Sequence, residues 1–235
     1  MKMRIMFVMA AMAAVAGISL SAQEAALPSM DKAVLWVKAD ALKMKDGEKI
    51  ATVKDLSGKN NDLTAPADKQ PTFKEKGAGG KPTIAFSNSY FDVKPPVKPS
   101  SEAYSMFILV SESAPAWQTF VATEGYRFQS NNYSVKDVSN IGEPDKQQTF
   151  PAIYELIQSD ANGILYINGS KIGDPAGHPS IESKGFRIGY DDLSKIGTED
   201  ALVGAIYEII IYKGALSDAD RIKVEQYLKT KYGVK

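Results

Sequence analysis

The sequence contains no cysteine and only one histidine, and these shortages exclude several classes of function. Without cysteine an exported domain has no disulfides, so its apolar core alone must stabilise it. The histidine, His178, lies in the loop-like stretch PAGHPS, outside any HExxH or clustered-histidine pattern. Zinc catalysis and serine hydrolysis therefore lack their usual groups. The sequence also has no GxSxG elbow, and its one glycine-rich stretch, GAGGKPT, leads into an expected strand where a phosphate-binding loop needs a helix.

An excess of positive charge is missing too. The chain has 28 Lys+Arg and 28 Asp+Glu, and removal of an amino-terminal leader with Lys2 and Arg4 would leave a slight acidic excess. A basic surface for nucleic acid or anionic lipid is therefore not expected. We expect neither nucleic acid nor a membrane surface as a partner.

The first 22 residues have the pattern of a secretory signal peptide. Lys2 and Arg4 precede an apolar run from Ile5 to about Val15, and small residues follow up to Ala22. A membrane anchor is less favoured, because the uninterrupted apolar run is shorter than the ~20 residues that a spanning helix needs. We therefore expect cleavage near Ala22, no membrane insertion of the mature protein, and a periplasmic or extracellular location. Residues 23–235 are expected to form a single domain.

Short runs rich in β-branched and aromatic residues, separated by Gly, Asn, Asp or Pro, predict an all-β protein. Candidate helices do not separate these strands, which favours a two-sheet antiparallel β-sandwich over a parallel sheet. The candidate strands are 33–39, 49–55, 81–86, 89–93, 103–112, 117–123, 149–159, 163–169, 185–190 and 204–214, together with the shorter runs YRFQS, YSVKD and SKIGD.

Two local signals are sharper than the strand pattern. In LYINGSKIG, Asn168 and Gly169 can both take positive φ, which predicts a type I′ hairpin turn. In LSDADRIKVEQYLKTKYG, Ser217 is placed to cap a helix that Gly233 ends, with Asp220 returning a reciprocal bond. We expect this C-terminal helix to dock on the sandwich through an apolar side formed by Ile222, Val224, Tyr227, Leu228 and Tyr232.

Several of these segments, in their order, resemble the laminin-G-like, concanavalin A-like jelly-roll domains of exported bacterial proteins. The resemblance is carried by AVLWVKADAL, VKDLSGKNNDLTAP, KPTIAF, GILYINGSKIG, FRIGY and above all GAIYEIIIYKGALSDADRIKVEQYLKTKYG, which together span most of the chain after the leader. It implies a two-sheet jelly roll that often binds glycans or proteins, sometimes with calcium at its rim. Because a fold does not fix a function, it does not identify the ligand.

Jelly-roll glycosidases of this superfamily carry carboxylates two residues apart on one strand, where one serves as nucleophile and another as acid. The strand AIYEIIIY has only Glu208, and parity gives it Ile206, Ile210 and Tyr212 as neighbours on its face. A carboxylate in an apolar strand is costly unless it is bonded. We therefore expect Glu208 to accept hydrogen bonds from loop amides or to pair with a Lys or Arg, and catalysis is the less favoured alternative.

Oxygen-bearing side chains crowd the stretch VKDLSGKNNDL. It does not fit an EF-hand, because Gly58 is fourth and Pro66 twelfth when counted from Asp55. An irregular calcium site is possible, with Asp55, Asn61 and Asp62 as candidate ligands. The favoured interpretation is a tight turn at Ser57–Gly58 with local backbone bonds.

Sugar binding needs aromatic faces beside amide and charged groups. Aromatic residues near expected strand ends, and the polar stretch RFQSNNYS, provide both kinds of group. The candidate ligand contacts are Trp117, Tyr126, Arg127, Gln129, Asn131, Asn132, Tyr133 and Tyr190. For each aromatic residue taken alone, a place in the core or on the ordinary surface is the favoured interpretation.

Together these patterns predict an exported, non-catalytic recognition domain that binds carbohydrate or a protein of the cell envelope or extracellular space. The alternatives are a structural or assembly protein of the envelope and a divergent glycoside hydrolase. Calcium is the only cofactor that the sequence leaves open.

Overall fold

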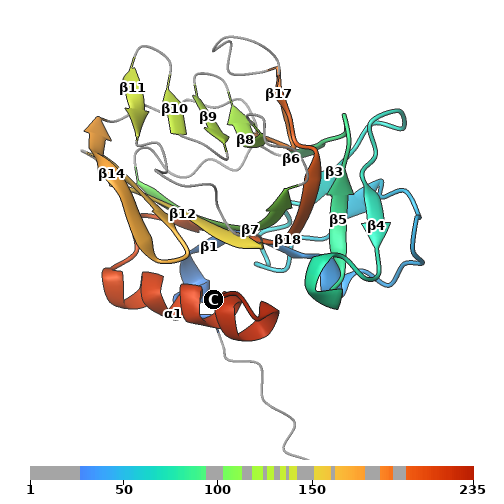
Figure 1. Cartoon of the computed structure of the whole chain (residues 1–235), viewed down its shortest axis with the longest axis horizontal. Helices are drawn as coiled ribbons and strands as arrows, with labels where there is room; N and C mark the ends of the chain where they lie inside the picture. The colour runs from blue at the N-terminus through green and yellow to red at the C-terminus, as the bar shows by residue number, and fades with distance from the viewer. Residues whose placement is uncertain are drawn as a thin grey trace, which may run out of the picture.

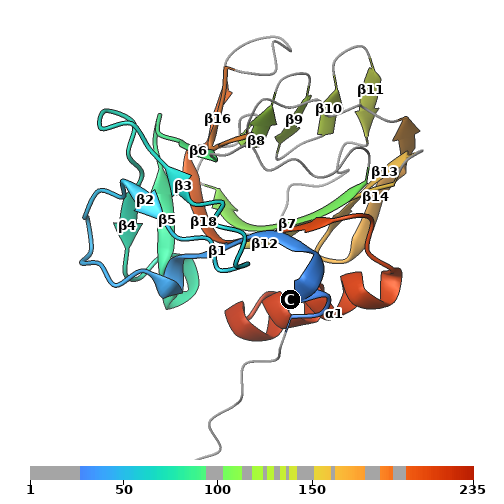
Figure 2. The same ribbon diagram turned by 180° about the vertical axis from the view of Figure 1, so that it is seen from behind.

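The computed structural model of the chain describes residues 27–93, 103–112, 118–123, 126–129, 133–135, 138–141, 151–159, 162–177, 186–192 and 200–235. These residues form a two-sheet antiparallel β-sandwich with one C-terminal helix, which confirms the predicted fold class. The two sheets face each other, and the helix lies outside one of them (Figures 1 and 2).

The first sheet, called sheet A here, has the strand order β14-β13-β12-β7-β18-β5-β4, and β1 pairs with β18. The long central pair, β7 and β18, is antiparallel over nearly its whole length. Its strands are β1 (Ala33–Lys38), β4 (Thr72–Lys74), β5 (Thr83–Phe86), β7 (Tyr104–Glu112), β12 (Ala152–Gln158), β13 (Asn162–Ile167), β14 (Ser170–Gly177) and β18 (Gly204–Lys213).

The second sheet, sheet B, has the order β11-β10-β9-β8-β15-β6-β3-β2. A separate two-stranded hairpin, β16 (Tyr190–Asp191) with β17 (Asp200–Ala201), follows β15. The strands of sheet B are β2 (Thr52–Val53), β3 (Leu63–Thr64), β6 (Phe91–Val93), β8 (Thr119–Thr123), β9 (Tyr126–Gln129), β10 (Tyr133–Val135), β11 (Val138–Ile141) and β15 (Phe186–Ile188). Short 3-10 turns occur at Met30–Lys32, Ala39–Ala41 and Ala78–Gly80.

The expected strands differ from these mainly at their ends and in the shortest elements. The expected strand 49–55 contracts to Thr52–Val53, while β3, β4, β11 and the β16–β17 hairpin were not expected. Runs of two or three residues are too short to show a period of two, and only pairing with distant strands fixes them. His178 lies outside the described residues.

Sheet A is apolar on both faces. In β7, Met106 and Ile108 face the core between the sheets, whereas Phe107 and Leu109 face the helix. The core includes a T-shaped aromatic contact between Phe120 and Tyr154, 4.7 Å apart. A strand buried on both faces reads as a continuous apolar run, which explains the stretches YSMFILV and AIYEIII.

The helix α1 (Asp218–Tyr232) covers the outer face of sheet A, as predicted. The Ser217 hydroxyl accepts from Asp220 N, and Gly233 closes the helix at φ 71°. The Asp220 carboxylate lies against Ser29 Oγ and Lys223 Nζ, where a reciprocal capping bond was expected. Ile222 was expected on the buried side but is 40% exposed. Among the described residues, no helix is both long and apolar enough to cross a membrane.

A bulge in β18 changes which residues share a face with Glu208. The pairing with β7 shifts between Ile206 and Glu208, so that Tyr207 and Glu208 both turn toward α1. Ile206 faces the core, which corrects the parity argument that put it beside Glu208. An extra residue in one strand reverses the alternation beyond it.

Candidate functional site

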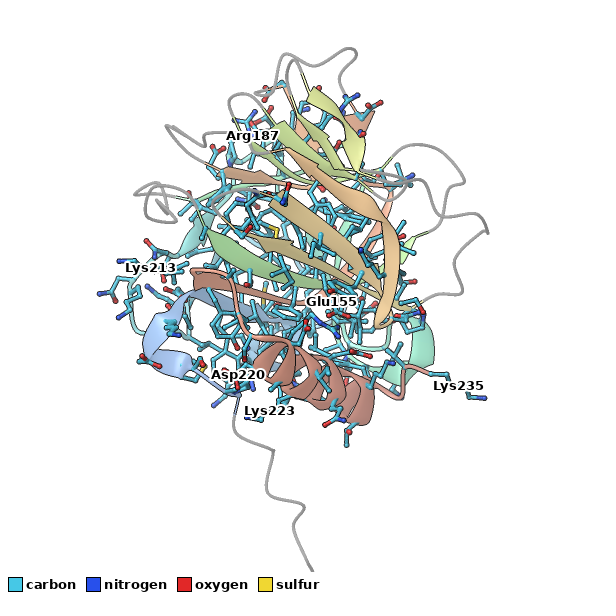
Figure 3. The ribbon with its side chains drawn as sticks, turned by 90° about the vertical axis from the view of Figure 1, so that its left-hand side faces the viewer. Glu155, Arg187, Lys213, Asp220, Lys223 and Lys235 are labelled. Atoms are coloured by element: carbon cyan, nitrogen blue, oxygen red, sulfur yellow. The ribbon has the colours of Figure 1, made fainter. Side chains whose placement is uncertain are left out.

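Polar side chains gather on the outer face of sheet B, away from α1. Strand alternation places Arg127 and Gln129 outward while Phe128 packs into the core. The register sets Arg127 and Arg187 on either side of Ala122. Figure 3 shows Arg187 on the sheet that is remote from the helix.

Arg187 is the centre of one half of this face. Its Nε donates to Asp92 Oδ1 at 3.0 Å, and its Nη1 donates to Asp192. Its Cζ lies 3.9 Å from the ring centre of Tyr90, which stacks on Tyr190 at 5.8 Å. Although burial favours the neutral form, the hydrogen bond and charge of Asp92 raise the pKa of Arg187 above its ordinary value.

Asp200, at the start of β17, is the centre of the other half. Its Oδ2 accepts from Arg127 Nη1 at 3.0 Å and from Gln129 Nε2 at 3.2 Å. Gln129 Nε2 also donates to Thr119 Oγ1 at 3.2 Å. These bonds tie the hairpin to the outer face of sheet B.

We call these five charged residues the arginine–aspartate cluster: Arg127, Arg187, Asp92, Asp192 and Asp200. The two guanidinium side chains are only 12–13% exposed, whereas the carboxylate side chains are 20–36% exposed. The cluster thus offers partly exposed carboxylate acceptors, each paired with a half-buried arginine. Such an arrangement suits hydrogen bonds with hydroxyl groups.

The structure brings together three of the eight predicted ligand contacts. Arg127 and Gln129 meet on Asp200, and Tyr190 pairs with Ala201 next to it. Tyr126 and Tyr133 lie in β9 and β10, and only the backbone of these two residues is described. Trp117, Asn131 and Asn132 lie outside the described residues.

The sequence analysis did not assign the remaining residues of this face to sugar binding. These residues are Tyr90, Asp92, Arg187, Asp192 and Asp200. A signal was present for two of them, because Asp92 in YFDV and Arg187 in FRIGY are single charges between apolar residues that point inward. Period-two alternation therefore marks both as outward-facing. It could not show that they pair.

The Asp55 loop is a turn organised by one carboxylate. Asp55 accepts from Trp36 N at 3.0 Å, from Ser57 N at 2.9 Å and Oγ at 2.8 Å, and from Asn61 N at 3.0 Å. Gly58 and Asn60 take positive φ, as the turn interpretation predicted. The carboxylate thus holds the loop against β1.

The other two candidate calcium ligands of this loop also have protein partners. Asn61 Nδ2 donates to Val34 O at 2.6 Å, and Asp62 accepts from Asp55 N at 3.0 Å. The hydrogen bond from Lys54 lowers the pKa of Asp62. The part of the chain that the structure describes holds no group of three His, Cys, Asp or Glu side chains that could bind a metal ion. Calcium at this loop stays a prediction.

Glu208 is fully buried under α1 and has several donors. Its Oε1 accepts from Trp36 Nε1 at 2.6 Å, and its Oε2 accepts from Lys231 Nζ at 2.9 Å and Tyr232 Oη at 2.8 Å. The Tyr227 hydroxyl donates to it as well, at 3.0 Å. The expected pairing with a lysine is confirmed, and the aromatic donors replace the loop amides. A carboxylate held this way anchors the helix and does not face a substrate.

Glu155 in β12 is a second buried anchor of the helix. It accepts from Arg221 Nη1 at 2.8 Å and from Gly169 N at 3.1 Å, in the Asn168–Gly169 turn. Glu225 shares the same Arg221 nitrogen at 3.2 Å. Burial raises the pKa of Glu155 to about 7, although the Arg221 hydrogen bond opposes the rise. Figure 3 shows Glu155 next to α1.

No protein-family model and no curated protein sequence matches this chain. Solved structures do resemble it. Domain 4 of AbnA, a GH43 extracellular arabinanase from Geobacillus stearothermophilus in complex with arabinotriose, has a TM-score of 0.59 and 15% identity, over 83% of this chain and 98% of that chain. Trypanosoma rangeli sialidase in complex with sialic acid has a TM-score of 0.50 and 11% identity, over 88% of this chain and 34% of that chain.

The binding domain of botulinum neurotoxin serotype D/C has a TM-score of 0.48 and 14% identity, over 85% of this chain and 53% of that chain. The chain therefore spans about a third of the sialidase and about half of the toxin domain. At such identities the likeness to the arabinanase domain and the sialidase shows the fold alone, a β-sandwich.

Proposed function

We propose that this chain is an exported, non-catalytic domain that binds carbohydrate at the outer face of sheet B, around the arginine–aspartate cluster and the β16–β17 hairpin. The observation that carries the proposal is the convergence of Arg127, Gln129 and Tyr190 on one face. These residues were selected from the sequence for sugar chemistry, and Asp200 joins two of them.

The chemistry of the face fits a polyhydroxylated ligand. Sugars are recognised by planar groups that cover their C–H faces and by paired donors and acceptors that meet their hydroxyls. Here Tyr90 and Tyr190 are stacked next to Arg187, and three carboxylates lie within the same cluster. The arabinotriose in the arabinanase domain supports the proposal only by showing that a sandwich of this kind accommodates a sugar.

Glycosidase activity is less favoured because of the place of Glu208. The sequence offered Glu208 as the candidate catalytic carboxylate on a strand. In the structure it lies beneath α1 and is 1% exposed. A catalytic carboxylate must reach the glycosidic bond together with a second one. The bonds to Lys231 and Tyr232 give Glu208 a stabilising role instead.

A glycan array followed by isothermal titration calorimetry tests the proposed function. We expect the purified protein to retain at least one oligosaccharide and the variant Asp192→Ala to bind it at least fivefold more weakly, because Asp192 is the most exposed carboxylate of the cluster. The matched control is Asp46→Ala, whose carboxylate is also exposed but pairs with Lys74 in sheet A. If no glycan on the array binds, with or without calcium, the proposal is wrong.

A further inference from the structure

The class of glycan follows from the exposure and pairing of the charged side chains in the arginine–aspartate cluster. We infer that the site takes an uncharged glycan, whose hydroxyls donate to the carboxylates, and that it disfavours uronic or sialic acids. The inference rests on the proposed function and specifies its ligand.

The first argument is accessibility. Asp192 is 36% exposed, and Asp92 and Asp200 are 20% and 22% exposed. The side chains of Arg127 and Arg187 are 12–13% exposed. Carboxylate oxygens are therefore available to a ligand at this face. Hydroxyl groups can donate to these oxygens, whereas a ligand carboxylate would be repelled by them.

The second argument is that each arginine already has an anionic partner. Arg187 pairs with Asp92 at 3.0 Å and also with Asp192, and Arg127 pairs with Asp200 at 3.0 Å. An acidic sugar that approaches a guanidinium also approaches the carboxylate already paired with it. Repulsion between the two carboxylates then offsets part of the attraction to the arginine. A neutral sugar meets no such repulsion.

The third argument is the net charge of the region. The two arginines face three aspartates in the described cluster, a net charge of −1. A surface of this sign lowers the local concentration of anionic ligands and is neutral toward uncharged ones.

Gln129 gives an independent indication of a hydroxyl-bearing ligand or bound water at this place. Its side chain is buried, and its Nε2 is committed to Thr119 and Asp200. Its Oε1 accepts no hydrogen bond from the described residues. Buried amide oxygens are normally satisfied, so a donor is expected next to this carbonyl. Because less than 1 Å² of this oxygen is accessible, the donor would lie beneath the outer surface, as a bound water does.

The test compares matched neutral and acidic sugars on the full protein. Calorimetry or saturation-transfer NMR is run with arabinotriose, galactotriose and trigalacturonic acid, and with each oligosaccharide that the array retains together with its uronic counterpart. We expect the neutral member of each pair to bind at least tenfold more tightly. Its affinity should change less than twofold between 50 and 500 mM NaCl, because no ligand charge is involved.

The variant Asp192→Asn distinguishes the mechanism from a mere loss of structure. It keeps the side-chain shape and removes one negative charge, so the neutral sugar should bind about as well or a few-fold more weakly. The acidic sugar should gain at least threefold, because Arg187 then has only Asp92 as anionic partner. The same substitution at Asp46, in a turn where the carboxylate pairs with Lys74 of sheet A, should change neither affinity.

The outcomes separate the two proposals. Tighter binding of the acidic sugar, weakened by Asp192→Ala, would leave carbohydrate binding at this face intact and overturn the inference about charge. Binding that no change at Asp192 affects would overturn the location of the site. Failure of every sugar to bind would overturn the proposed function and, with it, the inference.

Discussion

Glu155→Gln should abolish an unusual dependence of stability on pH. The Glu155 side chain is fully buried, and burial raises its pKa from 4.5 to about 7. The folded protein therefore holds this proton more tightly than the unfolded chain does. Such a group contributes stability that is fully present below about pH 4.5 and is lost as the pH rises through 7.

The size of the effect follows from the shift. Each pKa unit corresponds to about 1.4 kcal/mol, so the contribution of Glu155 to the free energy of unfolding falls by about 3 kcal/mol between pH 4.5 and pH 8. The groups that face Glu155 from packed elements are Arg221 and Glu225 of α1, Tyr166 of β13 and the amide of Gly169. Glutamine has no proton to lose. Its single amide oxygen can accept only one of the two hydrogen bonds, from Arg221 or from Gly169, and the resulting loss of stability is the same at every pH.

Urea unfolding followed by far-UV circular dichroism, at half-unit steps from pH 4 to pH 8.5, measures this contribution. We expect the unfolding free energy of the wild type to fall by about 3 kcal/mol relative to that of the variant as the pH rises across this range. Glu48→Gln is the control. The Glu48 side chain is exposed, and its carboxylate accepts a hydrogen bond from Lys45 N. A difference that stays constant over the whole range would refute the reasoning about Glu155.

Three further changes test the framework of the fold. Glu208→Ala should lower the free energy of unfolding by about 3 kcal/mol or more, because it leaves buried donors without their acceptor; a loss below about 1 kcal/mol in urea unfolding would contradict this. Gly169→Ala should cost roughly 1–3 kcal/mol more than Gly58→Ala. Both glycines have φ near +80°, but only the first would place Cβ 2.3 Å from Glu225; equal losses would argue against the contact. Asp55→Ala should lower Tm, since removing a carboxylate that accepts four hydrogen bonds costs about 1–3 kcal/mol. An unchanged Tm in a calorimetric scan would show that the loop does not depend on this carboxylate.

The sequence by itself determined features whose cause is local. The Asn168–Gly169 turn follows from the ability of these two residues to take positive φ, which they do at 51° and 84°. The limits of α1 follow from Ser217 and Gly233, because helix ends need side-chain or glycine caps. The all-β class follows from strand periodicity, which each segment carries on its own.

Only the tertiary structure decided which distant groups meet. Arg187 and Asp92 are 95 residues apart in the chain, and Arg127 and Asp200 are 73 apart. The first contact depends on the order of strands in sheet B, and the second on the packing of the β16–β17 hairpin against that sheet. A single sequence contains no local signal for either.

The two helix anchors show the same limit. The bulge that turns Glu208 toward α1 arises from pairing with β7, and the donor set around Glu155 forms only when α1 docks. Periodicity assigns a side chain to a face of its own strand, but the partner on that face comes from another segment. The burial and pKa of such a carboxylate are therefore properties of the assembled sandwich, not of the residues that flank it in the chain.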